Sequence, residues 1–149
     1  EHKQAENFTK LFLSLARDLR VIIIKFADRL NNMETIEYLS SNKRKEIALE
    51  TKEIFVPLAH RLGMAKLKWQ LEDLSLKCLD LRAFNSIKKK IETSTRLNED
   101  ILSNAIRPIK AELNSYKIKS NIFGRYKSIS SIHRKIENSG KNFEDIYDL

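Results

Sequence analysis

A mainly helical fold is predicted for this chain of 149 residues, followed by the first strand and helix of a mixed α/β unit. Three observations support this prediction. The chain has only 3 Gly and 2 Pro, which disfavours turn-rich sheets and glycine-rich phosphate loops. Apolar residues recur at helical spacing as far as about Leu113. Beyond that point, from Tyr116, apolar and polar residues alternate as they do in a half-exposed strand.

Two helices are expected in the first 39 residues. The first covers Ala5–Ala16, where apolar side chains recur three and four residues apart. Asp18 is suited to cap the second, which runs from Leu19 to about Leu39. The first half of this second helix is apolar nearly all round, so we expect it to be packed on several sides.

Further helices are expected over Lys43–Leu62, with a kink or junction at Pro57, and over Lys66–Leu79. The cluster Ser40-Ser41-Asn42 precedes the first of these and Gly63 follows it. One or two more helices are expected from Ala83 to about Leu113, broken or bent near Pro108.

The C-terminal third is interpreted as the start of a second domain. Tyr116, Ile118, Ser120 and Ile122 form the alternating pattern, and a short helix is expected over Ser128–Asn138. The predicted organisation is therefore a helical domain over 1–80, a helical connector over 81–115 and a second domain from 116 to 149.

Charge and cysteine content narrow the classes of function. The formal net charge is +8, and most of the excess lies after residue 80. A basic strand, turn and helix suit a polyphosphate or a nucleic acid, although a merely solvated surface fits the composition equally well. The longest apolar run is far too short to cross a bilayer, and the N-terminal residues do not resemble a secretion signal. Cys78 is the only cysteine, which fits a reducing compartment, and we expect a cytoplasmic protein.

The most informative stretch for chemistry is Lys25–Thr35. On a helix, Asp28, Asn32 and Thr35 form a polar stripe that begins with a carboxylate. If Asp28 is buried, it needs a cation, a metal ion or several hydrogen-bond donors beside it. The alternatives are a salt bridge with a nearby arginine or a solvent-facing helix edge. Because the three histidines are widely separated, the sequence does not assemble a complete metal site around one carboxylate.

The second candidate is the stretch Gly124–Lys135. A glycine turn that leads into a helix would place backbone N–H groups beside Arg125 and Lys127, which would form an anion site. Ser131 and Lys135 are four residues apart and would extend this site along one face of the helix. As a bare pattern this is weak evidence, because basic helix starts that are rich in serine are common.

These stretches, in this order, resemble the RelA/SpoT homologue family of bacterial alarmone synthetase–hydrolases. The segment QAENFTKLFLSLARDLRVIIIKFADRLNNMET resembles the last part of the helical hydrolase domain of the His-Asp metallohydrolase type. The segment ETKEIFVPLAHRLGMAKLKWQLEDLSLKCLD resembles the end of that domain. IFGRYKSISSIHRKIENSGKNFEDIYDL resembles the opening of the α/β, nucleotidyltransferase-like synthetase domain.

The resemblance implies roles for individual residues in the hydrolase segment. Asp28 matches the carboxylate that binds the hydrolase metal, usually Mn²⁺, while Asn32 and Thr35 match residues that line the pocket for guanosine nucleotides. A metal-bound water is a nucleophile near neutral pH, and the ion offsets charge on the 3′-pyrophosphate of (p)ppGpp.

The resemblance also implies roles in the synthetase segment. Residues that hold the ATP donor and the GDP or GTP acceptor match Arg125, Lys127, Ser131 and Lys135. Transfer of pyrophosphate from ATP depends on positioning and on neutralising phosphate charge, which such cations supply. The same resemblance implies Mg²⁺ as the cofactor of this reaction.

The chain also departs from the family pattern. Asn31 and Glu34 replace the usual His and Arg of the metal helix, and Tyr126 and Ser128 replace the usual Pro and His of the synthetase motif. The family's metal-binding histidines and its His-Asp pair are expected before residue 1, and the synthetase carboxylates that bind Mg²⁺ after Leu149. Neither active site is therefore expected to be complete within these residues.

Three functions are consistent with the sequence. The first is a fragment of an alarmone enzyme that hydrolyses (p)ppGpp or makes it in the stringent response, inactive as an isolated chain. The second is a catalytically silent helical interaction module, which would pair with a second chain that supplies the missing halves. The third is a basic nucleic-acid-binding module, which the lack of a set of aromatic stacking residues disfavours. No membrane partner is expected.

Overall fold

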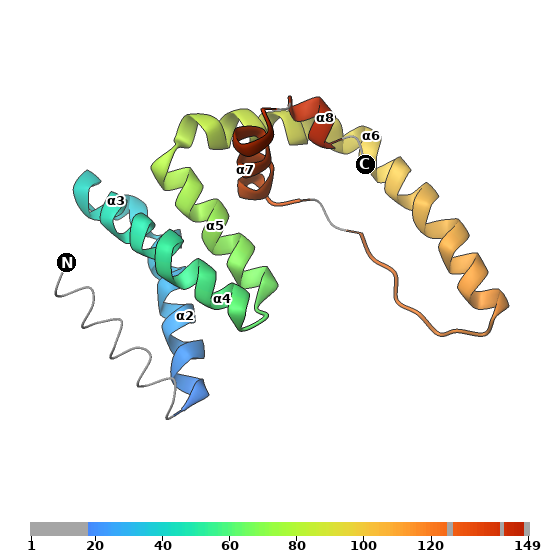
Figure 1. Ribbon diagram of the computed structural model, residues 1–149, viewed down its shortest axis with the longest axis horizontal. Helices are drawn as coiled ribbons and strands as arrows, with labels where there is room; N and C mark the ends of the chain where they lie inside the picture. Colours follow the sequence, from blue (N-terminus) through green and yellow to red (C-terminus); the bar gives the residue numbers. More distant parts are fainter. Residues whose placement is uncertain (1–17, 125–126, 141, 148–149) are drawn as a thin grey trace. The chain divides into compact units, whose positions relative to one another are not determined.

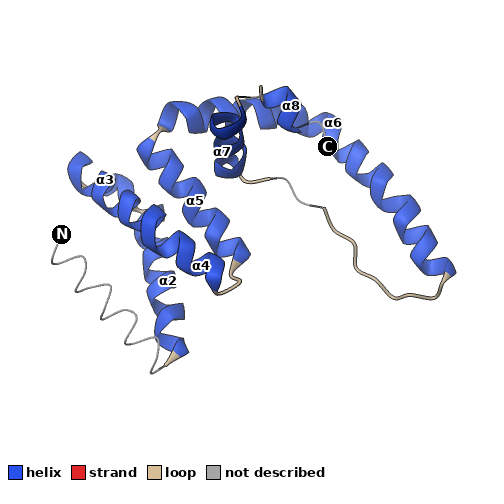
Figure 2. Ribbon diagram, viewed as in Figure 1, coloured by secondary structure: helices blue, strands red, loops and turns tan. Residues whose placement is uncertain are grey.

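The computed structural model describes residues 18–124, 127–140 and 142–147, and every regular element in these ranges is a helix (Figures 1 and 2). The chain divides into two compact units, Glu1–Leu79 and Asp80–Leu149, and each is considered by itself. The expected helix Ala5–Ala16 lies outside the described residues. In the part of the chain that is described, no helix is long and apolar enough to cross a membrane.

The first unit contains one long helix followed by a short turn of 3₁₀ helix. Helix α2 spans Leu19–Glu34, and η1 spans Ile36–Tyr38. Asp18 caps α2 as expected, because its carboxylate accepts a hydrogen bond from the Arg20 backbone N–H at 2.9 Å. The helix ends before the predicted Leu39, since Thr35 leaves the helical conformation while its N–H and hydroxyl both bond to the Asn31 carbonyl.

The remaining helical segments of this unit run consecutively from α3 to α4, and after a turn α5 packs back against them. Helix α3 covers Ser41–Glu50, the π-helical segment η2 covers Thr51–Phe55, and α4 covers Val56–Arg61; after a turn, α5 covers Ala65–Leu79. Gly63 adopts φ +70° and ends α4, with the Met64 N–H bonded to the Ala59 carbonyl at 2.9 Å. Glycine suits this position because side chains disfavour the left-handed region.

The kink expected at Pro57 takes the form of the π-helical turn that precedes it. The Val56 N–H donates to the Thr51 carbonyl, five residues back, and the Thr51 hydroxyl donates to the Ile47 carbonyl at 2.7 Å. Because Pro57 has no N–H to continue the α-helical ladder, the backbone widens by one residue just before it. The chain thereby stays helical from Ser41 to Arg61.

Helix α5 packs against α2, α3 and α4 and completes the core of the first unit. The buried residues of this core are Ile22, Phe26, Met33, Ala48, Phe55, Val56, Leu58, Ala59 and Leu71. Among its residues whose burial is described, helix α2 buries one face, contrary to the expectation of packing on several sides. Ile23 and Ile24 are 58% and 68% exposed, whereas Ile22 is 3% exposed. Successive residues on a helix point in different directions, so Ile22, Ile23 and Ile24 cannot all face the core, and only Ile22 does.

The second unit contains α6 at Leu81–Ser115, α7 at Ile129–Ser139 and α8 at Phe143–Tyr147. Helices α6 and α7 pack through Ile87 and Ile132, with Phe143 of α8 beside them. Helix α6 is continuous through Pro108 and is not broken there, since loss of one backbone hydrogen bond is tolerated in a helix of 35 residues.

The strand predicted to start at Tyr116 is wrong. Residues 118–124 form neither helix nor strand. Tyr116 caps α6, Lys117 takes a left-handed conformation with φ 57°, and the Ile118 N–H donates back to the Leu113 carbonyl at 2.9 Å. These bonds end the helix, so the first residues of the alternating pattern serve as a helix cap. The described residues offer no second strand with which the rest could pair.

Candidate functional site

The first predicted site lies on the exposed edge of α2. Asp28 and Asn32 are both exposed and lie one turn apart, and the Asn32 Nδ2 donates to the Asp28 Oδ2 at 3.3 Å. Thr35 is exposed at the end of the same helix and donates to the Asn31 carbonyl at 2.9 Å. We call Asp28, Asn32 and Thr35 the polar edge of α2.

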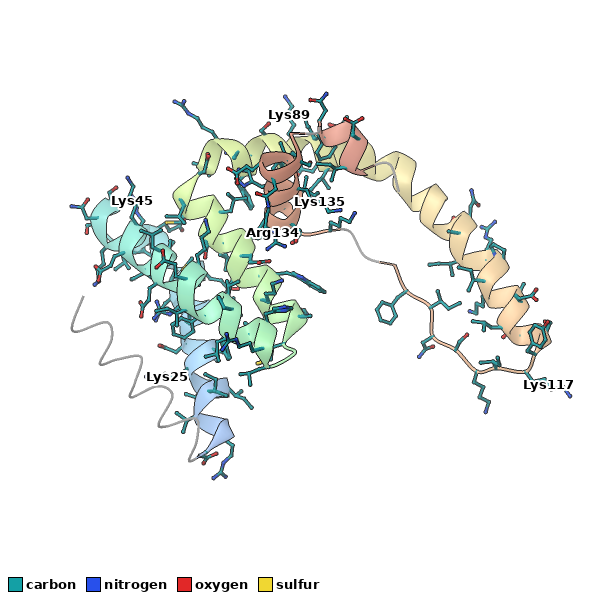
Figure 3. All side chains as sticks on the ribbon, in the orientation of Figure 1. Lys25, Lys45, Lys89, Lys117, Arg134 and Lys135 are labelled. Carbon is teal, nitrogen blue, oxygen red and sulfur yellow. The ribbon has the colours of Figure 1, made fainter. Side chains whose placement is uncertain are left out.

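The opposite face of α2 fixes where the polar edge points. Phe26 and Met33 are each 1% exposed and hold that face in the core. Lys25 is exposed and extends from α2 one turn before Asp28 (Figure 3). Asp28 is therefore a solvent-facing carboxylate, which was one of the alternatives that the sequence left open, and its charge needs no buried partner.

The other sequence alternative was a salt bridge between Asp28 and a nearby arginine, and the adjacent Arg29 instead pairs with another residue. The Arg29 Nη1 lies 2.9 Å from the Glu50 Oε2, and the guanidinium carbon lies 4.1 Å from the centre of the Phe55 ring. Sequence reasoning missed this group of residues, because its members lie 21 and 26 positions from Arg29 and only the packing of α2 beside α3 and η2 brings them together.

The described residues do not by themselves assemble a metal site. Among them, no three His, Cys, Asp or Glu side chains gather closely enough to hold a metal ion. Asp28 offers a carboxylate and Asn32 an amide oxygen, which are the ligand types that suit Mn²⁺ or Mg²⁺. Asp28 therefore fits such an ion as one ligand, while Asn32 hydrogen-bonds to that carboxylate.

Two departures from the family pattern lie beside the polar edge. Asn31 and Glu34 are both exposed, and Glu34 is the last residue of α2. A carboxylate at this end of the helix adds negative charge next to Thr35. It would weaken binding of a polyanion at that position.

The second predicted site is the start of α7. Ser128 is the N-cap: its Oγ accepts from the Ser131 N–H at 3.4 Å, and its O–H donates to the Ser131 Oγ at 2.7 Å. Its Oγ also lies 3.2 Å from that of Ser130. Ser128, which departs from the family's usual residue, is thus a good helix cap.

The cations of this second site lie on both sides of the cap. Lys127 is half-buried just before the helix, and Lys135 is exposed on α7, one turn after Ser131 (Figure 3). Arg125 and Tyr126 lie outside the described residues. The start of α7 therefore combines serine hydroxyls, two lysines and the positive end of a helix dipole, which together favour an anion.

Two side chains that lie away from these sites have shifted pKa values. Partial burial raises the pKa of the Cys78 thiol, and the positive charge of Arg44 opposes this shift. The Cys78 Sγ lies 3.6 Å from the Arg44 carbonyl oxygen and packs against the core of the first unit, as expected for a small core residue. At the start of α2, hydrogen bonds from Arg20 lower the pKa of Asp18.

Comparisons with known proteins first show which class of domain the N-terminal part of the chain matches. Residues 1–65 match the family model of the HD domain, a class that is generally metal-dependent. Beyond that match, nearly the whole chain is similar to enzymes of guanosine nucleotide metabolism. It is 42% identical over 98% of its length to a guanosine-3′,5′-bis(diphosphate) 3′-pyrophosphohydrolase of Spiroplasma citri, of which it covers 20%. Over nearly its whole length, the chain is thus similar to (p)ppGpp hydrolases and synthetases of the RelA/SpoT type.

Two further relatives are named for a synthetic reaction, as a pyrophosphokinase and as a (p)ppGpp synthase/hydrolase. The chain is 38% identical over 100% of its length to a GTP pyrophosphokinase of Myxococcus xanthus. It is 40% identical over 98% of its length to the bifunctional (p)ppGpp synthase/hydrolase RelA of Mycobacterium tuberculosis. In both cases it covers 20% of the relative. The chain thus spans about a fifth of the length of these relatives.

Proposed function

We propose that the first unit contributes to the hydrolysis of the 3′-pyrophosphate of (p)ppGpp. The observation that carries the proposal is the polar edge of α2, which faces away from the core within the region that matches the HD domain. Its carboxylate is the kind of ligand that such a reaction needs, and its position on a well-packed helix supports precise placement.

Each residue of the polar edge has a role in this proposal. Asp28 would hold Mn²⁺, which when bound supplies an activated water and offsets the charge of the pyrophosphate. Asn32 orients the Asp28 carboxylate through its hydrogen bond and, with Thr35, would line the pocket for the guanosine nucleotide. The remaining ligands would come from residues outside those described, or from a second chain.

We propose that the start of α7 contributes to the synthetic reaction, in which pyrophosphate passes from ATP to the 3′-hydroxyl of GDP or GTP. Lys127 and Lys135, with Arg125, would neutralise phosphate charge, and Ser131 would donate to a phosphate oxygen. In this proposal residues 116–149 begin an α/β, nucleotidyltransferase-like domain whose Mg²⁺ ligands lie elsewhere. The proposed compartment is the cytoplasm.

Chemical-shift mapping of the ¹⁵N-labelled chain tests the hydrolase proposal. With Mg²⁺ as a diamagnetic substitute for Mn²⁺, guanosine tetraphosphate should shift the amide signals of residues 28–35. The change Asp28→Asn should abolish these shifts, while Asp73→Asn, a change on α5, should leave them intact. If the nucleotide shifts no amides of α2, or shifts them equally in Asp28→Asn, the polar edge is not its site.

The synthetase proposal has its own test on the same sample. A non-hydrolysable ATP analogue with Mg²⁺ should shift the amides of residues 127–135, and the change Lys135→Gln should reduce the affinity at least several-fold, because one phosphate cation is lost. The exposed change Lys88→Gln, on α6, is the control. Equal affinity in the Lys135→Gln and Lys88→Gln variants would contradict the role of Lys135.

A further inference from the structure

Arg29 adjoins Asp28 in the sequence, but its side chain turns away from the polar edge and into the first unit. Its side chain is only 14% exposed, and that of its partner Glu50 is 30% exposed. Their contact at 2.9 Å links α2 to the last residue of α3. A partly buried pair of this kind is screened less by water than a surface pair, and the planar guanidinium makes it directional.

The π-helical segment brings the third member of this group into place. Phe55 is the last residue of η2 and is 6% exposed. Its ring lies 6.0 Å from that of Phe26, at an angle of 75°, and the Arg29 guanidinium carbon lies 4.1 Å from its centre. One ring therefore contacts both the apolar face of α2 and the charged side chain beside it.

Apolar packing alone does not determine the rotation of α2 about its axis. Hydrophobic contact is non-directional, so the helix could rotate about its axis while Phe26 and Met33 stayed in the core. An ion pair that also stacks on a ring has a fixed distance and plane, and it resists such a rotation. Glu50 immediately precedes η2 and Phe55 is its last residue, so the two ends of the π-helical turn provide both contacts.

We propose that Arg29 is a positioning residue, which through Glu50 and Phe55 fixes the rotation of α2 and hence the direction of Asp28 and Asn32. The purpose of this positioning rests on the function proposed above for the polar edge. Helix Cα atoms lie about 2.3 Å from the axis and a carboxylate about 5 Å, so a rotation of about 20° would move it by about 1.7 Å. Ligand distances to a metal tolerate only about 0.2 Å.

Residual dipolar couplings of the ¹⁵N-labelled whole chain test the proposal without a paramagnetic tag. Backbone N–H couplings along a helix oscillate with residue number, and the phase of the oscillation reports the rotation about the helix axis. With alignment fitted to α3, α4 and α5, we expect Arg29→Met to shift the phase for α2 by about 20° or to reduce its amplitude through averaging. Arg29→Lys keeps the charge but loses the plane and should show the same change in part.

Two further variants and a control make the result decisive. Glu50→Gln removes the charge of the partner and should reproduce the change, so the test stands even if Arg29→Met does not fold. Arg20→Lys, an exposed position on the same helix, should leave the phase as in the wild type. If α2 keeps its phase and amplitude in both Arg29→Lys and Glu50→Gln, while circular dichroism shows both variants folded, Arg29 has no positioning role.

Failure of the proposed function would look different. In a parallel titration, Mn²⁺ alone should enhance the relaxation of amide protons near Asp28 in the wild type. If that enhancement is absent but the phase of α2 still depends on Arg29, the metal role of Asp28 is wrong and the positioning by Arg29 is correct. If the enhancement is present and the phase is unchanged in the variants, the metal role of Asp28 is correct and the positioning by Arg29 is wrong.

Discussion

Two isoleucines on α2 provide a matched test of the direction in which this helix faces. Ile22 is 3% exposed and Ile24 is 68% exposed, and they lie two residues apart on the same helix. The change Ile22→Ala should lower the free energy of unfolding of the first unit by about 2–4 kcal/mol, because it removes buried methyl groups and leaves a cavity. Ile24→Ala should change it by less than about 0.5 kcal/mol, since little contact is lost and alanine favours helix.

Urea unfolding followed by the fluorescence of Trp69 is the assay. This tryptophan is the only one in the chain and lies on α5, so it reports on the first unit alone. A domain of this size has a stability of about 4–12 kcal/mol, so both variants remain measurable. Equal losses in the two variants, or a larger loss for Ile24→Ala, would refute the orientation of α2 and with it the outward direction of Asp28.

Three further predictions concern other parts of the molecule. Lys117→Gly should stabilise the second unit by about 1 kcal/mol in thermal unfolding, because Lys117 has φ 57° where glycine bears no steric cost; Lys119→Gly, in the same loop, should not. The Asp18 carboxyl, followed by its ¹³C signal, should titrate below the usual range, because Arg20 lowers its pKa. Its contribution to stability is therefore present above the pKa of the unfolded chain and is lost as the pH falls through the pKa of the folded chain. A normal titration of this carboxyl would contradict the Arg20 contact. Alkylation of Cys78 by iodoacetamide should reach half its maximal rate at a higher pH in the folded chain than in urea, because burial raises the thiol pKa; coincident profiles would show that the thiol is accessible.

Much of the helical framework could be predicted from local pattern. The cap at Asp18, the break at Ser40 and the end at Gly63 are short-range signals, and each depends on residues within one turn of helix. The polar stripe of Asp28 and Asn32 could be predicted for the same reason, since residues four apart on a helix are always neighbours.

Features that depend on distant residues could not be predicted. The pairing of Arg29 with Glu50 and Phe55 requires α2 to pack beside α3 and η2, and no local signal marks it. The exposure of Ile24 likewise depends on which face of α2 the rest of the unit covers. The strand predicted from Tyr116 is absent for a related reason. An alternating pattern indicates one apolar and one polar face, but a strand also needs a partner strand, which the pattern does not supply.

The most direct test of the proposed function is paramagnetic relaxation by Mn²⁺ in the ¹⁵N-labelled chain, compared between the wild type and Asp28→Asn. We expect Mn²⁺ to broaden the amide signals of residues 28–32 in the wild type and to leave them sharp in Asp28→Asn, because the carboxylate is the one acidic ligand of the polar edge. Broadening that is absent from α2, or equal in the two proteins, would contradict a metal-binding role for Asp28 and would remove the basis for placing hydrolysis of (p)ppGpp at this edge.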